Sequence, residues 1–93
     1  MQELSRFQQE FLEAAANAQE VCVQAVLCRN ELSLEDALYD ATAGVIITLM
    51  ELLDGYQGLE RLDVVSQKTG ERLREGPPVE LHDLVCGYLK RPD

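Results

Sequence analysis

The longest stretch of apolar residues at helical spacing lies at residues 34–53, and residues 41–50 within it carry no charged side chain. At about 100° per residue the apolar positions cover most of the circumference of a helix. Such a helix is typically buried, so we expect a central helix at about 34–54, with Leu38 and Leu49 fully buried. The uncharged run would be roughly 15 Å long, too short to cross a bilayer.

A second helical pattern covers residues 3 to about 29, where two sets of apolar residues recur every seven positions. The sets are Leu4, Phe11, Ala18 and Ala25, and Phe7, Ala14, Val21 and Cys28. Small residues in the middle of this stripe, and around Gly44 on the central helix, would allow two helices to approach closely. The pattern fits an antiparallel helical hairpin or a coiled-coil-like contact with a second chain, and the two can coexist.

Capping residues mark the boundaries of the central helix. Ser33, followed three residues later by Asp36, is a variant of the capping box and predicts the helix start. Gly55 is expected to end the helix in the left-handed conformation. The loop at residues 30–33 is short, so the two helices should lie side by side and antiparallel.

The last third of the chain changes to a shorter apolar period. Apolar and polar residues alternate around a turn ending at Gly70, which predicts a β-hairpin at about 61–74. Gly76-Pro77-Pro78 then breaks the chain, and a final helix is expected at about 79–90. The sequence therefore predicts one mostly helical α+β domain over residues 1–93, in the order α-α-β-β-α: a helical hairpin, a two-stranded β-hairpin and a C-terminal helix.

The formal net charge of −9 is concentrated in the first part of the chain. Residues 31–54 hold six acidic residues and no basic one, whereas residues 55–93 hold seven acidic against six basic. Binding to nucleic-acid phosphates, or to anionic membranes, needs a basic surface. The charge therefore argues against a nucleic-acid partner and against a membrane partner.

An acidic strip runs along the predicted central helix. Its members, Asp36, Asp40, Glu51 and Asp54, fall within about 60° of one another at helical spacing. Three interpretations stay open: a solvated face that keeps the protein soluble, internal ion pairs with the predicted hairpin, and a docking surface for a basic protein partner. The basic residues that the hairpin offers are Arg61, Lys68, Arg72 and Arg74.

Cysteine usage favours a reducing compartment. Three cysteines without a CxxC motif argue against a secreted disulfide framework. The polar start of the chain lacks the apolar region of a signal peptide. We therefore expect a cytoplasmic protein whose thiols are free and act as small apolar groups on helix faces.

His82 and Cys86 are the strongest candidates for chemistry, because residues four apart can place two zinc ligands on one side of a helix. A tetrahedral site needs two more ligands, and Cys22 and Cys28 are about 240° apart around their helix, so both cannot face one ion. A nucleophilic Cys/His pair lacks a recognisable oxyanion donor, and no phosphate-binding, metalloprotease, EF-hand or dinucleotide motif occurs. We expect no cofactor, no metal and no enzymatic activity. The alternative is a metal- or small-molecule-binding accessory protein, or a weak enzyme, using His82, Cys86 and nearby carboxylates.

Ile46, Ile47 and Met50 face away from the side of the central helix that the first helix should cover. The predicted hairpin and last helix must cover them, or a second chain must, because exposing them would forgo roughly 1.5–3 kcal/mol each. A two-fold homodimer is the commonest arrangement that closes such a surface. The sequence therefore predicts a small acidic interaction module (adaptor, inhibitor or immunity-type protein), homodimeric through the first two helices or an edge of the hairpin.

Overall fold

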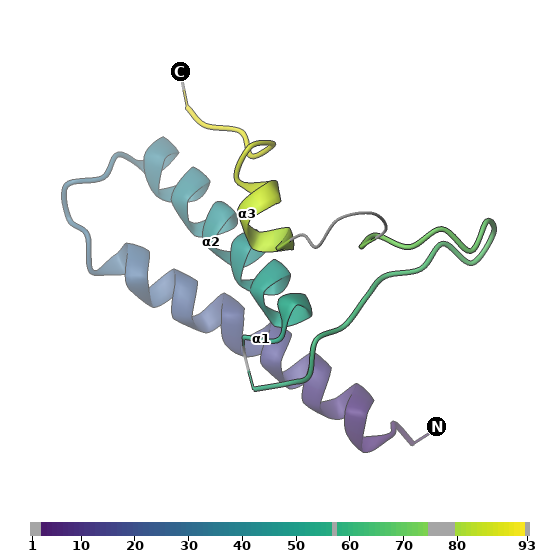
Figure 1. The fold of residues 1–93 in the computed structure, drawn as a ribbon. Coiled ribbons are helices and arrows are strands. Elements are labelled where there is room, and N and C mark those ends of the chain that lie inside the picture. Colours follow the sequence, from purple (N-terminus) through teal and green to yellow (C-terminus); the bar gives the residue numbers. More distant parts are fainter. Residues whose placement is uncertain (1–2, 57, 75–79, 93) are drawn as a thin grey trace.

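The computed structural model describes residues 3–56, 58–74 and 80–92, and these contain three helices. They are α1 (Arg6–Leu27), α2 (Leu34–Asp54) and α3 (Leu81–Val85). Within the described residues, α1 and α3 each pack against α2 and make no contact with each other (Figure 1). None of these three helices is long and apolar enough to cross a membrane. α2 is the central element and has the bounds that the sequence predicts.

The two long helices form an antiparallel hairpin with well-defined ends (Figure 1). α1 begins at Arg6, three residues later than the sequence predicts, and Ser5 before it forms a full capping box. Ser33 caps α2 by accepting a hydrogen bond from the backbone N–H of Asp36 at 3.1 Å. Gly55 ends α2 with a φ of 94°, which confirms the expected left-handed end.

α1 and α2 approach each other closely at Gly44. A Cβ atom at this position would lie 3.0 Å from Sγ of Cys22, which is tighter than ordinary van der Waals contact. The same sulfur lies 3.8 Å from Oγ1 of Thr48. The absence of a side chain at Gly44 is therefore what allows the two helix backbones to come together here.

The predicted α+β fold is wrong, because the described residues contain no β-strand or sheet and the fold is helical. Where the sequence predicts a hairpin, residues 61–74 form two antiparallel limbs that lead away from the helices (Figure 1). We call this segment the arm. Its limbs share one isolated bridge, between Val65 and Arg72, and its turn contains Gly70 at a φ of 79°.

In the arm, side-chain oxygens accept hydrogen bonds from backbone N–H groups that a longer β-ladder would pair with carbonyls of the opposite strand. At the base of the arm, Oδ1 of Asp63 accepts hydrogen bonds from the N–H groups of Val64 at 2.8 Å and Arg74 at 3.2 Å. In the turn, Oγ of Ser66 accepts from the N–H of Thr69 at 3.2 Å. Such side-chain acceptors compete with regular pairing, and two strands without apolar support are marginal in water. The alternating pattern alone is therefore insufficient to form strands.

α3 is also shorter than the helix predicted at about 79–90. Beyond Val85 the backbone bonds tighten to three-residue spacing, with the N–H of Gly87 donating to the carbonyl of Leu84 at 3.1 Å. Gly87 lies inside the predicted helix, and a glycine destabilises a helix interior by about 1 kcal/mol relative to alanine. The spacing of apolar residues, on which the prediction depends, does not include this effect. The predicted break at Gly76-Pro77-Pro78 lies outside the described residues.

Few apolar side chains are buried within the described residues: Ala18, Leu52 and Leu81. Leu38, expected to be fully buried, is 58% exposed, and Leu49 is half-buried. The chain exposes 7320 Å², about 1,900 Å² more than the roughly 5,400 Å² of a compact monomer of 10.4 kDa. The radius of gyration, 15.5 Å, likewise exceeds the roughly 12 Å typical of 93 residues.

Candidate functional site

An open groove lies between α1 and α2, and we call it the hairpin groove. Its volume is about 660 Å³. It is lined by Ala15, Ala16, Gln19 and Val23 of α1 and by Ala41, Thr42, Val45 and Ile46 of α2. Exposed leucines at helical spacing from these residues extend the apolar surface: Leu12 and Leu27 on α1, Leu34 and Leu38 on α2.

A second hollow, between α2 and the C-terminal segment, shares Thr42 and Ile46 with the hairpin groove. Its other lining residues are Tyr39, Ala43, Tyr88, Leu89 and Lys90. Because two residues of α2 line both hollows, the apolar surface continues across α2 from the side of α1 to the side of α3. The exposed face is therefore wider than the groove itself.

The three candidate dimer contacts lie in different environments. Ile46 is exposed and lines the hairpin groove. Ile47 is half-buried and lines a hollow with Leu89 and Pro92 of the C-terminal segment, and Met50 is also half-buried. The C-terminal segment thus lies beside Ile47, whereas Ile46 is the most open of the three to a second chain.

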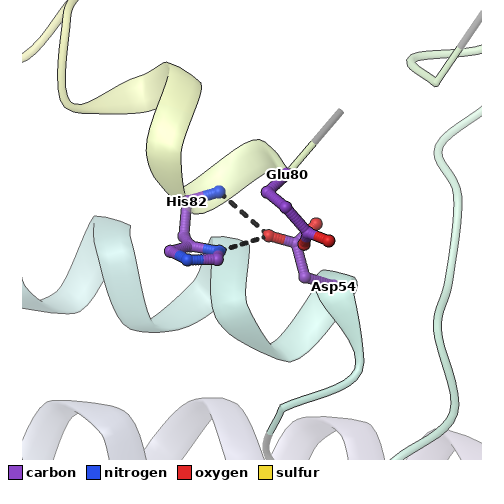
Figure 2. A group of neighbouring side chains, drawn as sticks. All are labelled: Asp54, Glu80 and His82. Atoms are coloured by element: carbon purple, nitrogen blue, oxygen red, sulfur yellow. Dashed lines mark hydrogen bonds and ion pairs between the residues drawn. The ribbon is translucent and has the colours of Figure 1, made fainter. Parts of the chain in front are cut away.

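Asp54, the last residue of α2, has a side chain that is 0% exposed. Its Oδ1 lies 2.8 Å from Nη1 of Arg74 and accepts a hydrogen bond from the N–H of Leu81 at 3.0 Å. Its Oδ2 accepts from the N–H of His82 at 3.0 Å and lies 2.7 Å from Nδ1 of the same residue (Figure 2). We call the cluster of Asp54, Arg74 and His82 the Asp54 junction. Each carboxylate oxygen in it has two partners.

The Asp54 junction supplies the cap that α3 lacks locally. Glu80, at the N-cap position of α3, makes no side-chain cap hydrogen bond, and the first two N–H groups of α3 donate to Asp54 instead. A carboxylate at the C-terminal end of a helix opposes the helix dipole, so Asp54 is unfavourably placed with respect to α2 alone. The start of α3 and the neighbouring cations offset this cost and link the two helices.

Arg74 anchors the base of the arm to the end of α2. Besides Asp54, its guanidinium donates from Nε to the carbonyl of Leu62 and from Nη2 to the carbonyl of Leu53, each at 2.7 Å. The N–H of Leu62 donates to the carbonyl of Leu53 at 2.8 Å, and Nη1 of Arg61 lies 3.3 Å from the carbonyl of Asp54. The last carbonyls of a helix have no partner within it, and here they hold both limbs of the arm.

The charges of the Asp54 junction stabilise one another. Burial raises the pKa of Asp54, but hydrogen bonds from the His82 backbone and ring, from Leu81 and from Arg74 outweigh it and hold the pKa well below its usual range. The hydrogen bond to Asp54 raises the pKa of His82 above its ordinary value, against the opposing effect of desolvation. The nearby carboxylate of Asp83, 3.4 Å from Nε2, adds to this increase.

Asp54, Glu80 and His82 could each present one ligand atom to a metal ion, since these atoms lie within 4.8 Å of one another (Figure 2). However, Arg74 lies 2.8 Å from Asp54, and Arg61 lies 3.2 Å from Glu80. A divalent cation would have to displace both arginines from their carboxylates and Nδ1 of His82 from Asp54. The cluster contains its own cations, which favours a structural role over metal binding.

His82 and Cys86 do not form a common site with their side chains. The ring of His82 is held by Asp54 and meets the ring of Tyr56 edge-on, with centroids 5.3 Å apart. The thiol of Cys86 donates instead to the backbone carbonyl of His82 at 3.3 Å. Cys86 is exposed, and like Cys22 and Cys28 it is a free thiol.

The acidic strip is not uniform. Asp54 is enclosed and paired with Arg74, as in the internal-pair interpretation of the sequence. Asp40 lies at the surface, where its Oδ2 is 3.0 Å from Nη1 of Arg29. Asp36 and Glu51 are half-buried. The docking of a basic partner on the strip stays a prediction, and Asp54 itself is inaccessible for it.

The sequence pattern does not single out the anchor Arg74 or the groove residue Val23. A signal for the first is Asp54 itself, because an acidic side chain in the last turn of a helix needs a partner from elsewhere. A signal for the second is that Val23 is apolar but lies outside the heptad stripe of α1. Comparisons with family models, with curated proteins and with solved structures found no match to this chain.

Proposed function

We propose that this protein is a non-catalytic protein–protein interaction module that acts as a homodimer and buries the hairpin groove between its two copies. The observation that carries the proposal is the surplus of about 1,900 Å² of exposed surface over a compact monomer. Obligate dimers bury roughly 1,000–2,500 Å² on each partner. The surplus is therefore about the size of one such interface.

The chemistry of the exposed face supports the same proposal. Exposed Leu34, Leu38 and Ile46 lie on α2, beside a groove whose floor is made of alanines. Contiguous apolar patches of this kind on soluble proteins mark surfaces that another molecule covers. Two-fold symmetry is the simplest solution, because the same patch then serves both partners.

The cysteines and the charge of the chain support a compartment and a kind of partner for the proposed dimer. Three free thiols support a reducing compartment, which we take to be the cytoplasm. The acidic composition of residues 1–54, with ten acidic residues against two basic ones, supports recognition of a basic protein partner. The net charge of −9 does not favour nucleic acid.

Sedimentation velocity over a range of roughly 1 to 100 µM tests the proposal, together with thermal unfolding over the same range. We expect a species of twice the 10.4 kDa chain mass and an unfolding midpoint that rises with concentration. A species of 10.4 kDa at every concentration, with a constant midpoint, would refute the homodimer.

A further inference from the structure

We propose that the arm of each copy packs into the hairpin groove of the other, so that the dimer is closed by reciprocal exchange of arms. This inference rests on the proposed homodimer and adds the identity of the segment that covers the groove. The occupant is a second copy of this chain, and the contact is made in trans. Four features of the structure support it.

The first feature is the apolar surface of the arm. The N–H of Leu73 donates to the carbonyl of Val64 at 2.8 Å, which places these two residues opposite each other on adjacent limbs. With Val65 they supply the apolar part of a shallow hollow on the arm, and all three are about half exposed. Ser66, Glu71 and Arg72 line the rest of this hollow. Cross-strand apolar pairs of this kind normally pack against another layer. Figure 1 shows the arm projecting away from the three helices, so none of these helices provides such a layer.

The second feature is the anchoring of the arm, which argues against docking on its own groove. Both limbs are tied at their base to the last carbonyls of α2, through Leu62 and Arg74. The arm leaves this end of α2 and leads away from the three helices (Figure 1). A fixed base and a fixed direction preorganise the arm for a second chain.

The third feature is size. From Leu62 to Lys68 the limb can reach about 20 Å at 3.3 Å per residue. The groove from Ala16 to Val23 is about 11 Å long. Its small alanine side chains and its volume of about 660 Å³ leave room for the side chains of Val64 and Leu73. The arm is therefore long enough to lay its apolar pair along the groove.

The fourth feature is charge. Arg61 and Arg74 are paired with Glu80 and Asp54 at the base of the arm, so only its outer part can meet a second chain. This outer part, residues 64–73, contains two basic residues and one acidic residue, whereas residues 1–54 contain ten acidic and two basic. By helical position the exposed Glu13, Glu20 and Glu35 flank the groove. Packing two acidic helical hairpins directly against each other would bring like charges together. An arm whose outer part has a small net positive charge, placed between them, reduces this repulsion.

Disulfide trapping between two different single-cysteine chains tests the exchange. Both chains carry Cys22→Ala, Cys28→Ser and Cys86→Ser; one adds Leu73→Cys on the arm and an affinity tag, and the other adds Val23→Cys in the groove. We expect a mixed disulfide, resolved by mass, after the two chains are mixed and oxidised. The matched control replaces Leu73→Cys by Leu84→Cys, because Leu84 on α3 is 50% exposed and Leu73 is 51% exposed. Mixed product no greater than in this control, or Val23→Cys self-linked dimers alone, would overturn the exchange.

A second measurement separates this inference from the proposed function. Sedimentation should show that Leu73→Asp weakens the dimer roughly 10-fold or more, because it places a carboxylate in an apolar contact beside an acidic rim. Leu84→Asp should leave the dissociation constant within about twofold. Circular dichroism at the same concentrations checks that both variants keep their helices. A dimeric wild type with unaffected Leu73→Asp would refute the arm exchange alone, whereas a monomeric wild type would refute the homodimer and the exchange with it.

Discussion

The Asp54 junction and the hairpin groove both include residues of α2, but their side chains differ in how far they are enclosed. At the end of α2, the carboxylate of Asp54 is enclosed and each of its oxygens has two partners. Near the middle of α2, Thr42 and Ile46 line two open hollows, and Ile46 is 37% exposed. The charged side chain of Asp54 is thus more enclosed than the apolar side chain of Ile46 on the same helix.

The two regions have different roles: one fixes the orientation of neighbouring segments, and the other offers apolar surface whose burial supplies free energy. Buried ion pairs contribute little net stability because desolvation offsets much of their attraction, but their geometry is specific. Apolar burial is favourable and has no preferred direction. The Asp54 junction sets the positions of the arm and α3, whereas the hairpin groove retains apolar area that association can still bury.

The largest expected effect is that of Asp54→Ala on folding stability. Removing the carboxylate takes away the charged partner of Arg74 and the acceptor of the first two N–H groups of α3, and breaking a buried pair in this way costs about 3–5 kcal/mol. Urea denaturation followed by circular dichroism measures the change. Asp40→Ala is the matched control, because its pair with Arg29 is exposed and is worth about 0–1 kcal/mol. Equal losses in the two variants would show that the junction is no more important than a surface pair.

A smaller effect is expected from one charge placed in the hairpin groove. Val23→Asp should weaken the dimer roughly 10-fold or more, because a carboxylate in an apolar interface loses its hydration. Val21→Asp is the matched control: it lies on the same helix, lines a different hollow with Asn17 and Glu51, and is more exposed, at 66% against 39%. Sedimentation equilibrium measures both dissociation constants. If Val21→Asp had the larger effect, the interface would lie on the opposite side of α1.

The long helices are predictable from sequence because their signals are local. The caps at Ser33 and Gly55 and the unbroken apolar period give α2 its observed bounds. The arm fails as a β-hairpin because its pattern requires a supporting layer and because Asp63 and Ser66 take backbone donors. α3 is shorter than predicted because Gly87 interrupts it.

The candidate site is predictable only in part, since it depends on contacts between distant residues. Asp54 resembles the other acids of its strip until Arg74, twenty positions later, folds back to it. Leu38 resembles a core residue in the sequence, although it is exposed in the structure. The spacing of apolar residues shows that a helix is apolar on all sides, but it does not show which element covers each side. Sequence periodicity thus identifies apolar faces, and the tertiary arrangement decides which of them stay open.

The smallest expected effect is a pH dependence that belongs to the Asp54 junction and not to the hairpin groove. His82 is the only histidine of the chain, and its pKa is raised in the folded state by Asp54, with Asp83 and Glu51 adding to the increase. The stability it contributes is fully present below the unfolded pKa of about 6.5 and is lost as the pH rises through the higher folded pKa. Asp54 has a lowered pKa, so its contribution is present above about pH 3.8 and is lost in more acidic solution. We therefore expect a higher urea midpoint at about pH 6 than at about pH 8, and His82→Asn should remove most of this difference. A midpoint difference that persists in His82→Asn would assign the titration to another group and weaken the contrast between the two regions.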